Sequence, residues 1–155
     1  MINFFSKNKG NLIFVLSAIS LFISFYFNED GSGGGAKGDF EITYGFVLAL
    51  QENLLADPKD WSLVHTPLHF IILSLVTRVI SDTDFLRLLF CLFSLSLPIL
   101  FFSSVLLRKF NNISKISILI LSSAIIFIPS FRYTSIWAND LITSLIFFTI
   151  SISFF

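Results

Sequence analysis

Residues 88–107 read LLFCLFSLSLPILFFSSVLL, an unbroken run without a charged side chain. A helix needs about 20 predominantly apolar residues to cross the hydrocarbon core of a bilayer, and this run meets that length. Arg87 stands immediately before the run, and Arg108 and Lys109 follow it. We therefore expect a membrane-spanning helix over residues 86–107.

Further uncharged runs cover residues 11–28, 116–131 and 141–155. Hydrophobic residues make up 55% of the chain and charged residues 13%, with a mean hydropathy of +0.86, so the surface is too apolar for water. We predict an all-α integral membrane protein with two extracytoplasmic juxtamembrane helices and about four transmembrane helices. The expected spans are residues 12–27, 86–107, 115–130 and 137–155.

Basic residues set the expected orientation. Lys7 and Lys9 precede the first apolar run, and no small-residue cleavage pattern follows it, so we interpret this run as a retained signal anchor with a cytoplasmic N-terminus. Arg108, Lys109 and Lys115 then lie in a cytoplasmic loop between the second and third spans. We expect a multi-pass protein of the cell membrane, inner or plasma.

The stretch 67–80 decides between two topologies. Its apolar part has only about 14 residues, fewer than a crossing needs. Ser74, Thr77, Arg78 and Ser81 recur at helical spacing and predict one polar stripe. We expect a juxtamembrane helix that lies along the membrane surface. If it crossed instead, the resulting five-span arrangement would export the basic loop.

The segment between the first span and this helix has two parts. Residues 28–38 include Gly31-Ser32-Gly33-Gly34-Gly35 and are expected to form a flexible linker. Residues 39–57 carry apolar side chains on one helical face and end at Asp57-Pro58, which predicts the first juxtamembrane helix. The linker departs from the phosphate-binding loop pattern around its lysine and follows no strand, so a nucleotide site is not expected.

Charge and cysteine content exclude other classes of partner and site. The formal net charge is zero and no cluster of Lys and Arg exists, which argues against a nucleic-acid partner. Cys91 is the only cysteine, so neither an intramolecular disulfide nor a cysteine-based metal site can form.

Asp39 and Glu41 follow the first span and open the first juxtamembrane helix, near the expected lipid headgroups. Carboxylates at such a position can act as general bases or metal ligands. Alternatively, Asp39 caps the helix and Glu41 complements its dipole. The sequence leaves both interpretations open.

Four further residues are candidates for a site. His65 and His69 lie one helical turn apart and could share a metal, although an interfacial histidine is more often half-solvated. Arg132 and Asp140 flank an expected outer turn at 131–139 and could form an anchor with a local ion pair. Because an ionisable group at the start of an uncharged helix is costly unless it is paired or faces a cavity, Asp140 is also a candidate for a second acidic wall opposite Asp39.

The order of these features resembles the GT-C membrane glycosyltransferases, which include the protein O-mannosyltransferases and the aminoarabinose and lipopolysaccharide sugar transferases. The resemblance covers nearly the whole chain but only the amino-terminal part of such an enzyme. The chain has His-Thr-Pro-Leu in place of the usual His-Pro-Pro-Leu, and an acid-x-acid where Asp-Glu or Asp-x-Asp is frequent. The elements that carry it are Asp39-Phe40-Glu41, His65-Thr66-Pro67-Leu68, Phe85-Leu86-Arg87-Leu88, a basic turn, Pro129-Ser130-Phe131-Arg132 and Asp140.

The resemblance implies transfer of a sugar from a polyprenyl-phosphate donor to an extracytoplasmic acceptor. Asp39 would be the general base, with Glu41 as its catalytic support. His65, Arg132 and Asp140 would bind substrate, and Arg132, His65 or a divalent metal would stabilise the departing phosphate. Such a metal, if used, would be held by acids such as Asp39 and Asp140.

Enzymes of this superfamily generally have more spans, and this chain stops inside an apolar run at Phe154-Phe155. We therefore expect a truncated product that is inactive alone unless a second chain supplies the missing helices. Two other classes stay open. One is a non-catalytic small multi-pass membrane protein. The other is a transporter subunit, which would use polar groups such as Ser94 and Ser96 at mid-membrane depth.

Overall fold

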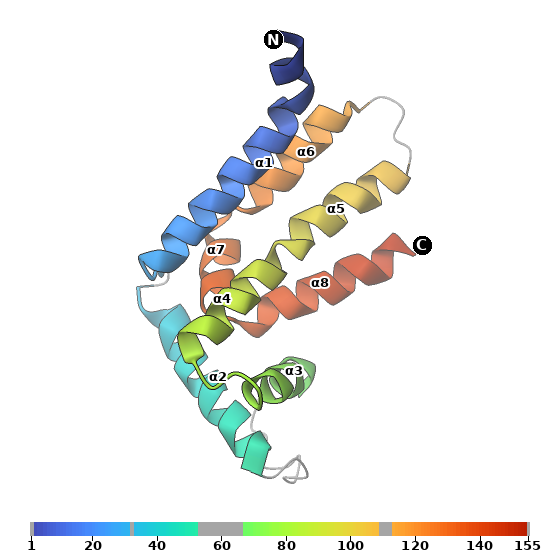
Figure 1. Cartoon of the computed structure of the whole chain (residues 1–155). Coiled ribbons are helices and arrows are strands. Elements are labelled where there is room, and N and C mark those ends of the chain that lie inside the picture. The colour runs from blue at the N-terminus through green and yellow to red at the C-terminus, as the bar shows by residue number, and fades with distance from the viewer. Residues whose placement is uncertain (1, 32, 53–66, 109–112, 155) are drawn as a thin grey trace.

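The computed structural model describes residues 2–31, 33–52, 67–108 and 113–154, and the regular secondary structure of these residues is helical throughout (Figure 1). The predicted all-α class is confirmed. The helices are α1 (Ile2–Tyr26), α2 (Gly35–Glu52), α3 (Pro67–Thr77), α4 (Thr83–Ser94), α5 (Ser96–Leu107), α6 (Lys115–Ile125), α7 (Pro129–Ile136) and α8 (Asp140–Ser153).

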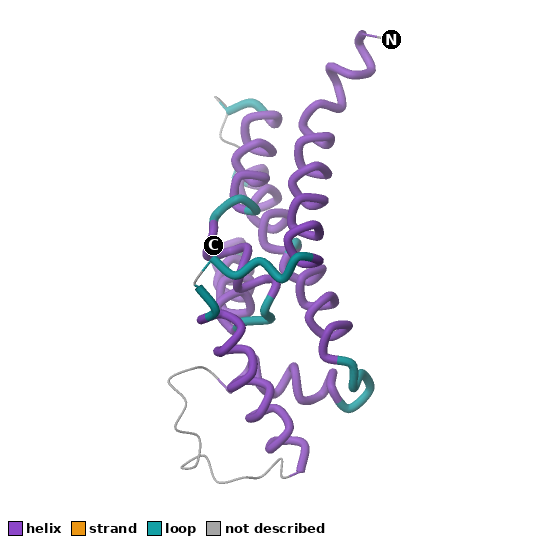
Figure 2. Tube along the Cα trace, turned by 90° about the vertical axis from the view of Figure 1, so that its left-hand side faces the viewer, coloured by secondary structure: helices purple, strands orange, loops and turns teal. Residues whose placement is uncertain are grey.

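The helices form a bundle with a helical pair at one end. Helix α1 packs along α6, α5 packs between α6 and α8, and α4 packs on the short helix α7. Helices α2 and α3 pack on each other and lie at the end of the molecule opposite the N-terminus (Figures 1 and 2). The chain passes from α1 to α2 at the junction of these two parts.

Among the described residues, Thr83–Leu107 is long and apolar enough to cross a membrane, and the bent pair α6–α7 would count as a second span if taken as one. The apolar helical segments Gly10–Tyr26, Leu68–Thr77 and Asp140–Ser153 have fewer than the 18 residues that a candidate membrane span needs. The number of crossings therefore stays a prediction, while the all-helical architecture is established.

The longest apolar stretch is interrupted at Leu95, where α4 ends and α5 begins. Pro98 has no N–H to donate to the carbonyl of Ser94, and its ring crowds that carbonyl. The Leu95 N–H bonds to the carbonyl of Leu92 at 3.2 Å, three residues back, so the helix tightens at the break. The expected span of 86–107 is thus two helical segments, preceded by an extra turn that starts at Thr83.

The expected straight span at 115–130 and the turn at 131–139 differ from the structure. Helix α6 ends at Ile125, and α7 continues from Pro129 after a bend of 60°. Proline disfavours helical geometry in the residue before it, and Ile128 is extended, with φ −66° and ψ 122°. Pro129 then occupies the first turn of α7, where its missing N–H costs nothing.

Helix α2 begins at Gly35 rather than at Asp39, so the expected linker is shorter. Gly33 and Gly34 have φ of 67° and 99°, a turn that glycine adopts without strain. The Asp30 carboxylate then accepts a hydrogen bond from the Lys37 N–H at 3.0 Å, near the start of the helix. Asp39 is therefore inside the helix and is not its cap.

Helix α3 turns the opposite face outward from the one expected. Ser74 and Thr77 of the predicted polar stripe are buried, and Gln51 of α2 donates to the Ser74 carbonyl and to the Thr77 hydroxyl. The outward side chains are apolar, at Leu68 and Leu75. Contact with α2 thus gives the buried Thr77 hydroxyl a partner on another helix, which the sequence pattern alone did not reveal.

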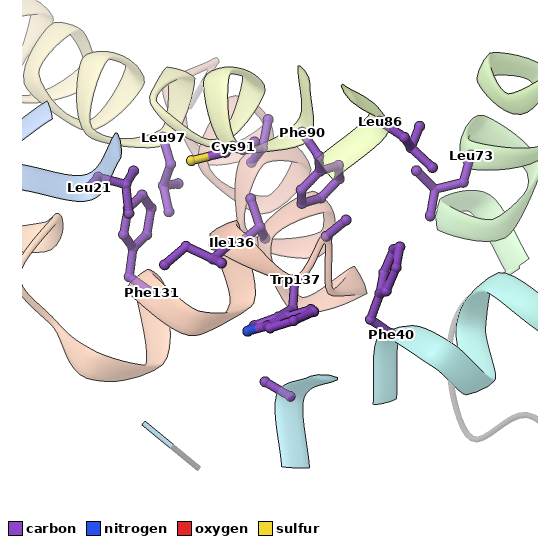
Figure 3. Packing of buried hydrophobic residues seen from close by; sticks show 14 of the residues in the cluster. Leu21, Phe40, Leu73, Leu86, Phe90, Cys91, Leu97, Phe131, Ile136 and Trp137 are labelled. Atoms are coloured by element: carbon purple, nitrogen blue, oxygen red, sulfur yellow. The ribbon is translucent and has the colours of Figure 1, made fainter. Parts of the chain in front are cut away.

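The main core lies where the two parts of the molecule meet (Figure 3). It joins side chains from α1, α2, α3, α4, α5, α7 and α8, so it ties the α2–α3 pair to the bundle. Its labelled members are Leu21, Phe40, Leu73, Leu86, Phe90, Cys91, Leu97, Phe131, Ile136 and Trp137.

Candidate functional site

An open cleft of about 560 Å³ lies between α2 and the N-terminal end of α4. The loop after α1 forms one side, and Trp137, which follows α7, forms part of the base. Its lining combines acids, bases and aromatic rings: Asn28, Asp30, Gly34, Lys37, Phe40, Glu41, Tyr44, Thr83, Asp84, Arg87 and Trp137. We call this space the α2–α4 cleft.

Arg87 is the buried cation of the cleft, with a side chain only 6% exposed. Its Nε donates to the Ile136 carbonyl at 3.1 Å, its Nη2 to the Asn28 amide oxygen at 2.9 Å, and its Nη1 to Asp84 Oδ1 at 3.0 Å. The guanidinium carbon lies 3.7 Å from the centroid of the Trp137 ring, within range of a cation–π contact.

The start of α4 explains this position. Asp82 caps the helix by accepting from the N–H groups of Asp84 and Phe85 at 2.9 and 3.1 Å, which begins the helix at Thr83. Arg87 then falls in the second turn, on the face toward α7. Its position next to an apolar run did not by itself predict a functional role, because arginines near the ends of such helices commonly extend to the membrane interface.

One face of α2 supplies the opposite wall. Lys37, Phe40, Glu41 and Tyr44 follow helical i, i+3, i+4, i+7 spacing and all line the cleft. Lys37 Nζ and Glu41 Oε1 are 3.8 Å apart, and both side chains are more than half exposed, at 59% and 65%. This pair is therefore open to solvent and to a ligand.

Asp39, the leading candidate from sequence, is exposed but is not part of the cleft wall. Two residues along an α-helix are separated by about 200° of rotation. Asp39 therefore projects from a different face of α2 than Glu41. The structure thus separates the two acids that the sequence analysis treated as one unit.

Arg132 binds a carboxylate that sequence reasoning did not select. Its Nε and Nη2 donate to the two oxygens of Glu29 at 2.9 and 3.0 Å, and Nη2 also contacts the Ser24 hydroxyl. The hydrogen bonds from Arg132 lower the pKa of Glu29, against the opposing effect of burial. The Glu29 carbonyl accepts from Trp137 Nε1 at 3.1 Å, which links this ion pair to the base of the cleft.

The remaining candidates are dispersed. Asp140 is the first residue of α8, after the N-cap Asn139, and neither Asp140 nor Arg132 lines the cleft. His65 lies outside the described residues. His69 is 1% exposed and its Nδ1 lies 2.9 Å from Thr143 Oγ1, which connects α3 to α8. Burial and this contact point to a packing role for His69.

Within the described residues, no group of three or more His, Cys, Asp or Glu side chains is arranged to hold a metal ion. The divalent metal considered from sequence, held by Asp39 and Asp140, thus has no such cluster in the described part of the chain. The cleft instead combines carboxylates, cations and aromatic rings, a lining that suits a polar organic ligand.

Comparison with known proteins found no matching family model, no matching curated protein and no matching solved structure.

Proposed function

We propose that this chain acts in sugar transfer at a membrane surface, from a polyprenyl-phosphate donor to an extracytoplasmic acceptor, with the α2–α4 cleft receiving the reacting groups. The observation that supports this most is one cavity containing the Glu41 carboxylate, the cations of Lys37 and Arg87, and aromatic rings. Its volume of about 560 Å³ lies in the range of small-molecule sites.

The cleft chemistry matches such a transfer. A carboxylate takes a proton from the incoming hydroxyl, and fixed cations stabilise the charge of the departing phosphate. Glu41 is better placed than Asp39 for the first role because it faces the cleft. Lys37 and Arg87 are better placed than Arg132 for the second, because they line the cleft and Arg132 does not.

The arrangement of charge is consistent with an extracytoplasmic cleft. The start of α1, which contains Lys7 and Lys9, lies toward the same end of the molecule as the last turn of α5, before Arg108, and the first turn of α6, which contains Lys115 (Figure 1). The α2–α3 pair lies at the other end. If basic ends remain in the cytoplasm, the cleft faces outward. Apolar side chains exposed along α1 and α8 would then contact lipid.

The test uses the protein reconstituted in lipid nanodiscs with a photoactivatable polyprenyl-phosphate sugar. We expect crosslinks on α2 and on the first turns of α4. In membranes that show transfer, Glu41→Gln should lower the rate by ~10²-fold or more, the usual weight of a general base. Asp39→Asn is the matched control, one acid on another face of the same helix, and should change the rate little. Crosslinks away from the cleft, or the reverse order of the two variants, would contradict the proposal.

A second candidate is a non-catalytic multi-pass membrane protein. One observation favours it: Lys37 pairs with Glu41, Arg87 with Asp84, and Arg132 with Glu29, so these charges already have internal partners. On this alternative the ion pairs have only structural roles: two of them lie within α2 and within α4, and the third joins α7 to the chain after α1. Reconstituted protein would then capture the donor analogue no better than empty nanodiscs do.

A further inference from the structure

We propose that Asp84 is an exchangeable counter-ion on Arg87, and that a phosphate ester binds the α2–α4 cleft by displacing it. This deepens the proposed function and rests on it for the class of ligand. It assigns roles to two residues that the sequence analysis did not select.

Arg87 is fixed in place before any ligand arrives. Its Nε and Nη2 are held by the Ile136 carbonyl and by Asn28, which belong to different parts of the chain. The Trp137 ring covers one face of the guanidinium. These contacts use Nε, Nη2 and one ring face, so only Nη1 donates to Asp84. The guanidinium is therefore held with Nη1 directed toward the cleft before a ligand binds.

Asp84 is held much less firmly. Its side chain is 81% exposed, against 6% for Arg87. It is three residues before Arg87 on α4, so a rotation of its side chain moves the carboxylate into water without moving the backbone. Water already solvates most of the Asp84 carboxylate, so leaving Arg87 costs Asp84 little, provided that another anion takes its place beside the buried guanidinium.

A phosphate oxygen suits the vacated position. Planar guanidinium groups bind phosphate through short, charge-assisted hydrogen bonds, often to two oxygens at once. The exchange replaces one anion by another, so Arg87 keeps a negative partner throughout. On the facing wall, the Lys37 ammonium pairs with the Glu41 carboxylate, and the Lys37 backbone N–H donates a hydrogen bond to the Asp30 carboxylate. Both of these carboxylates therefore have a partner on their own wall of the cleft.

The decisive prediction is a gain of affinity. Asp84→Asn removes the competing charge while keeping the side-chain size. The variant should bind farnesyl phosphate about fivefold more tightly, which corresponds to the largest free energy usually measured for an exposed ion pair. Binding is measured with radiolabelled farnesyl phosphate on the full chain in nanodiscs, with empty nanodiscs subtracted and farnesol as the neutral probe. Inorganic phosphate, added as a competitor, shows whether the anion alone is enough or the lipid tail is needed.

Asp82→Asn is the matched control. It removes the same charge two residues away, and asparagine caps a helix as well as aspartate does. Tighter binding by Asp84→Asn alone supports displacement. Equal tightening by both variants, weaker binding by Asp84→Asn, or no binding by any form would overturn it. If Asp84→Asn binds farnesyl phosphate more tightly than the natural chain and Asp82→Asn do, but no sugar is transferred, this inference stands and the proposed function is wrong.

Discussion

The Glu29–Arg132 pair makes an asymmetric prediction about stability. The Arg132 side chain is 13% exposed and the Glu29 side chain 40% exposed. Removing the glutamate charge leaves a nearly buried guanidinium without its anion. Removing the arginine leaves a carboxylate that water can reach. We therefore expect Glu29→Gln to destabilise the fold more than Arg132→Met.

The size of the effect follows from the contacts. Glu29 accepts two hydrogen bonds from Arg132, and bonds to charged groups contribute ~1.5–3 kcal/mol each. Partial exposure of Glu29 reduces this sum, and glutamine keeps one acceptor. We expect a loss of ~2 kcal/mol for Glu29→Gln and ~1 kcal/mol for Arg132→Met. The double variant should lose less than the two together, because the residues share one interaction.

Unfolding in mixed micelles, followed by tryptophan fluorescence, measures these differences. The pKa of Glu29 is lowered in the folded chain, so its contribution is present above the ordinary value of 4.5 and is lost as the pH falls through the lower folded pKa. The stability of the Glu29→Gln protein should therefore decline less steeply than that of the natural chain in this acidic range. A larger loss for Arg132→Met, or fully additive losses, would refute the reasoning.

Other variants test local geometry in the same unfolding assay. Gly34→Ala places a side chain at φ +99° and should cost ~1–3 kcal/mol, whereas Gly38→Ala, in a helix with open space around it, should stabilise by ~0.5–1 kcal/mol. Equal effects of the two glycine changes would contradict the described turn. Trp137→Phe removes the donor to the Glu29 carbonyl and should cost ~1 kcal/mol, measured for both proteins by far-ultraviolet circular dichroism because the variant lacks one of the two tryptophans. An unchanged midpoint for that variant would show that this hydrogen bond contributes nothing to stability.

The helical class and the approximate positions of the helices were predictable from the sequence. Uncharged runs and proline positions are local signals, and they locate most of the helices approximately. Two differ: α1 begins at Ile2 rather than at residue 12, and α7 lies where a turn was expected. The break near Pro98 and the bend before Pro129 belong to the same class of signal. The length of an apolar run does not show whether the helix over it is straight or bent. A straight span over 115–130 and a bent pair of helices therefore have the same hydropathy pattern.

The partners of the charged residues were not predictable in the same way. Asp39 and Glu41 are two residues apart, and only the start of α2 at Gly35 and its packing decide which of them faces the cleft. The pairing of Arg132 with Glu29 joins residues 103 apart in sequence. Periodicity within one segment contains no information about such contacts, so sequence reasoning selected plausible charges and missed Arg87 and Glu29.

Two consecutive residues after α1 connect it to two other helices. Asn28 accepts from Arg87 of α4, and Glu29 accepts from Arg132 of α7, so both arginines bind the chain just after α1 ends. Asn28 has φ +52°, a conformation that asparagine tolerates better than most residues, and this turn directs its amide and the next carboxylate to different helices. These two contacts hold the chain after α1 against α4 and α7, and both residues of the first contact, Asn28 and Arg87, line the α2–α4 cleft.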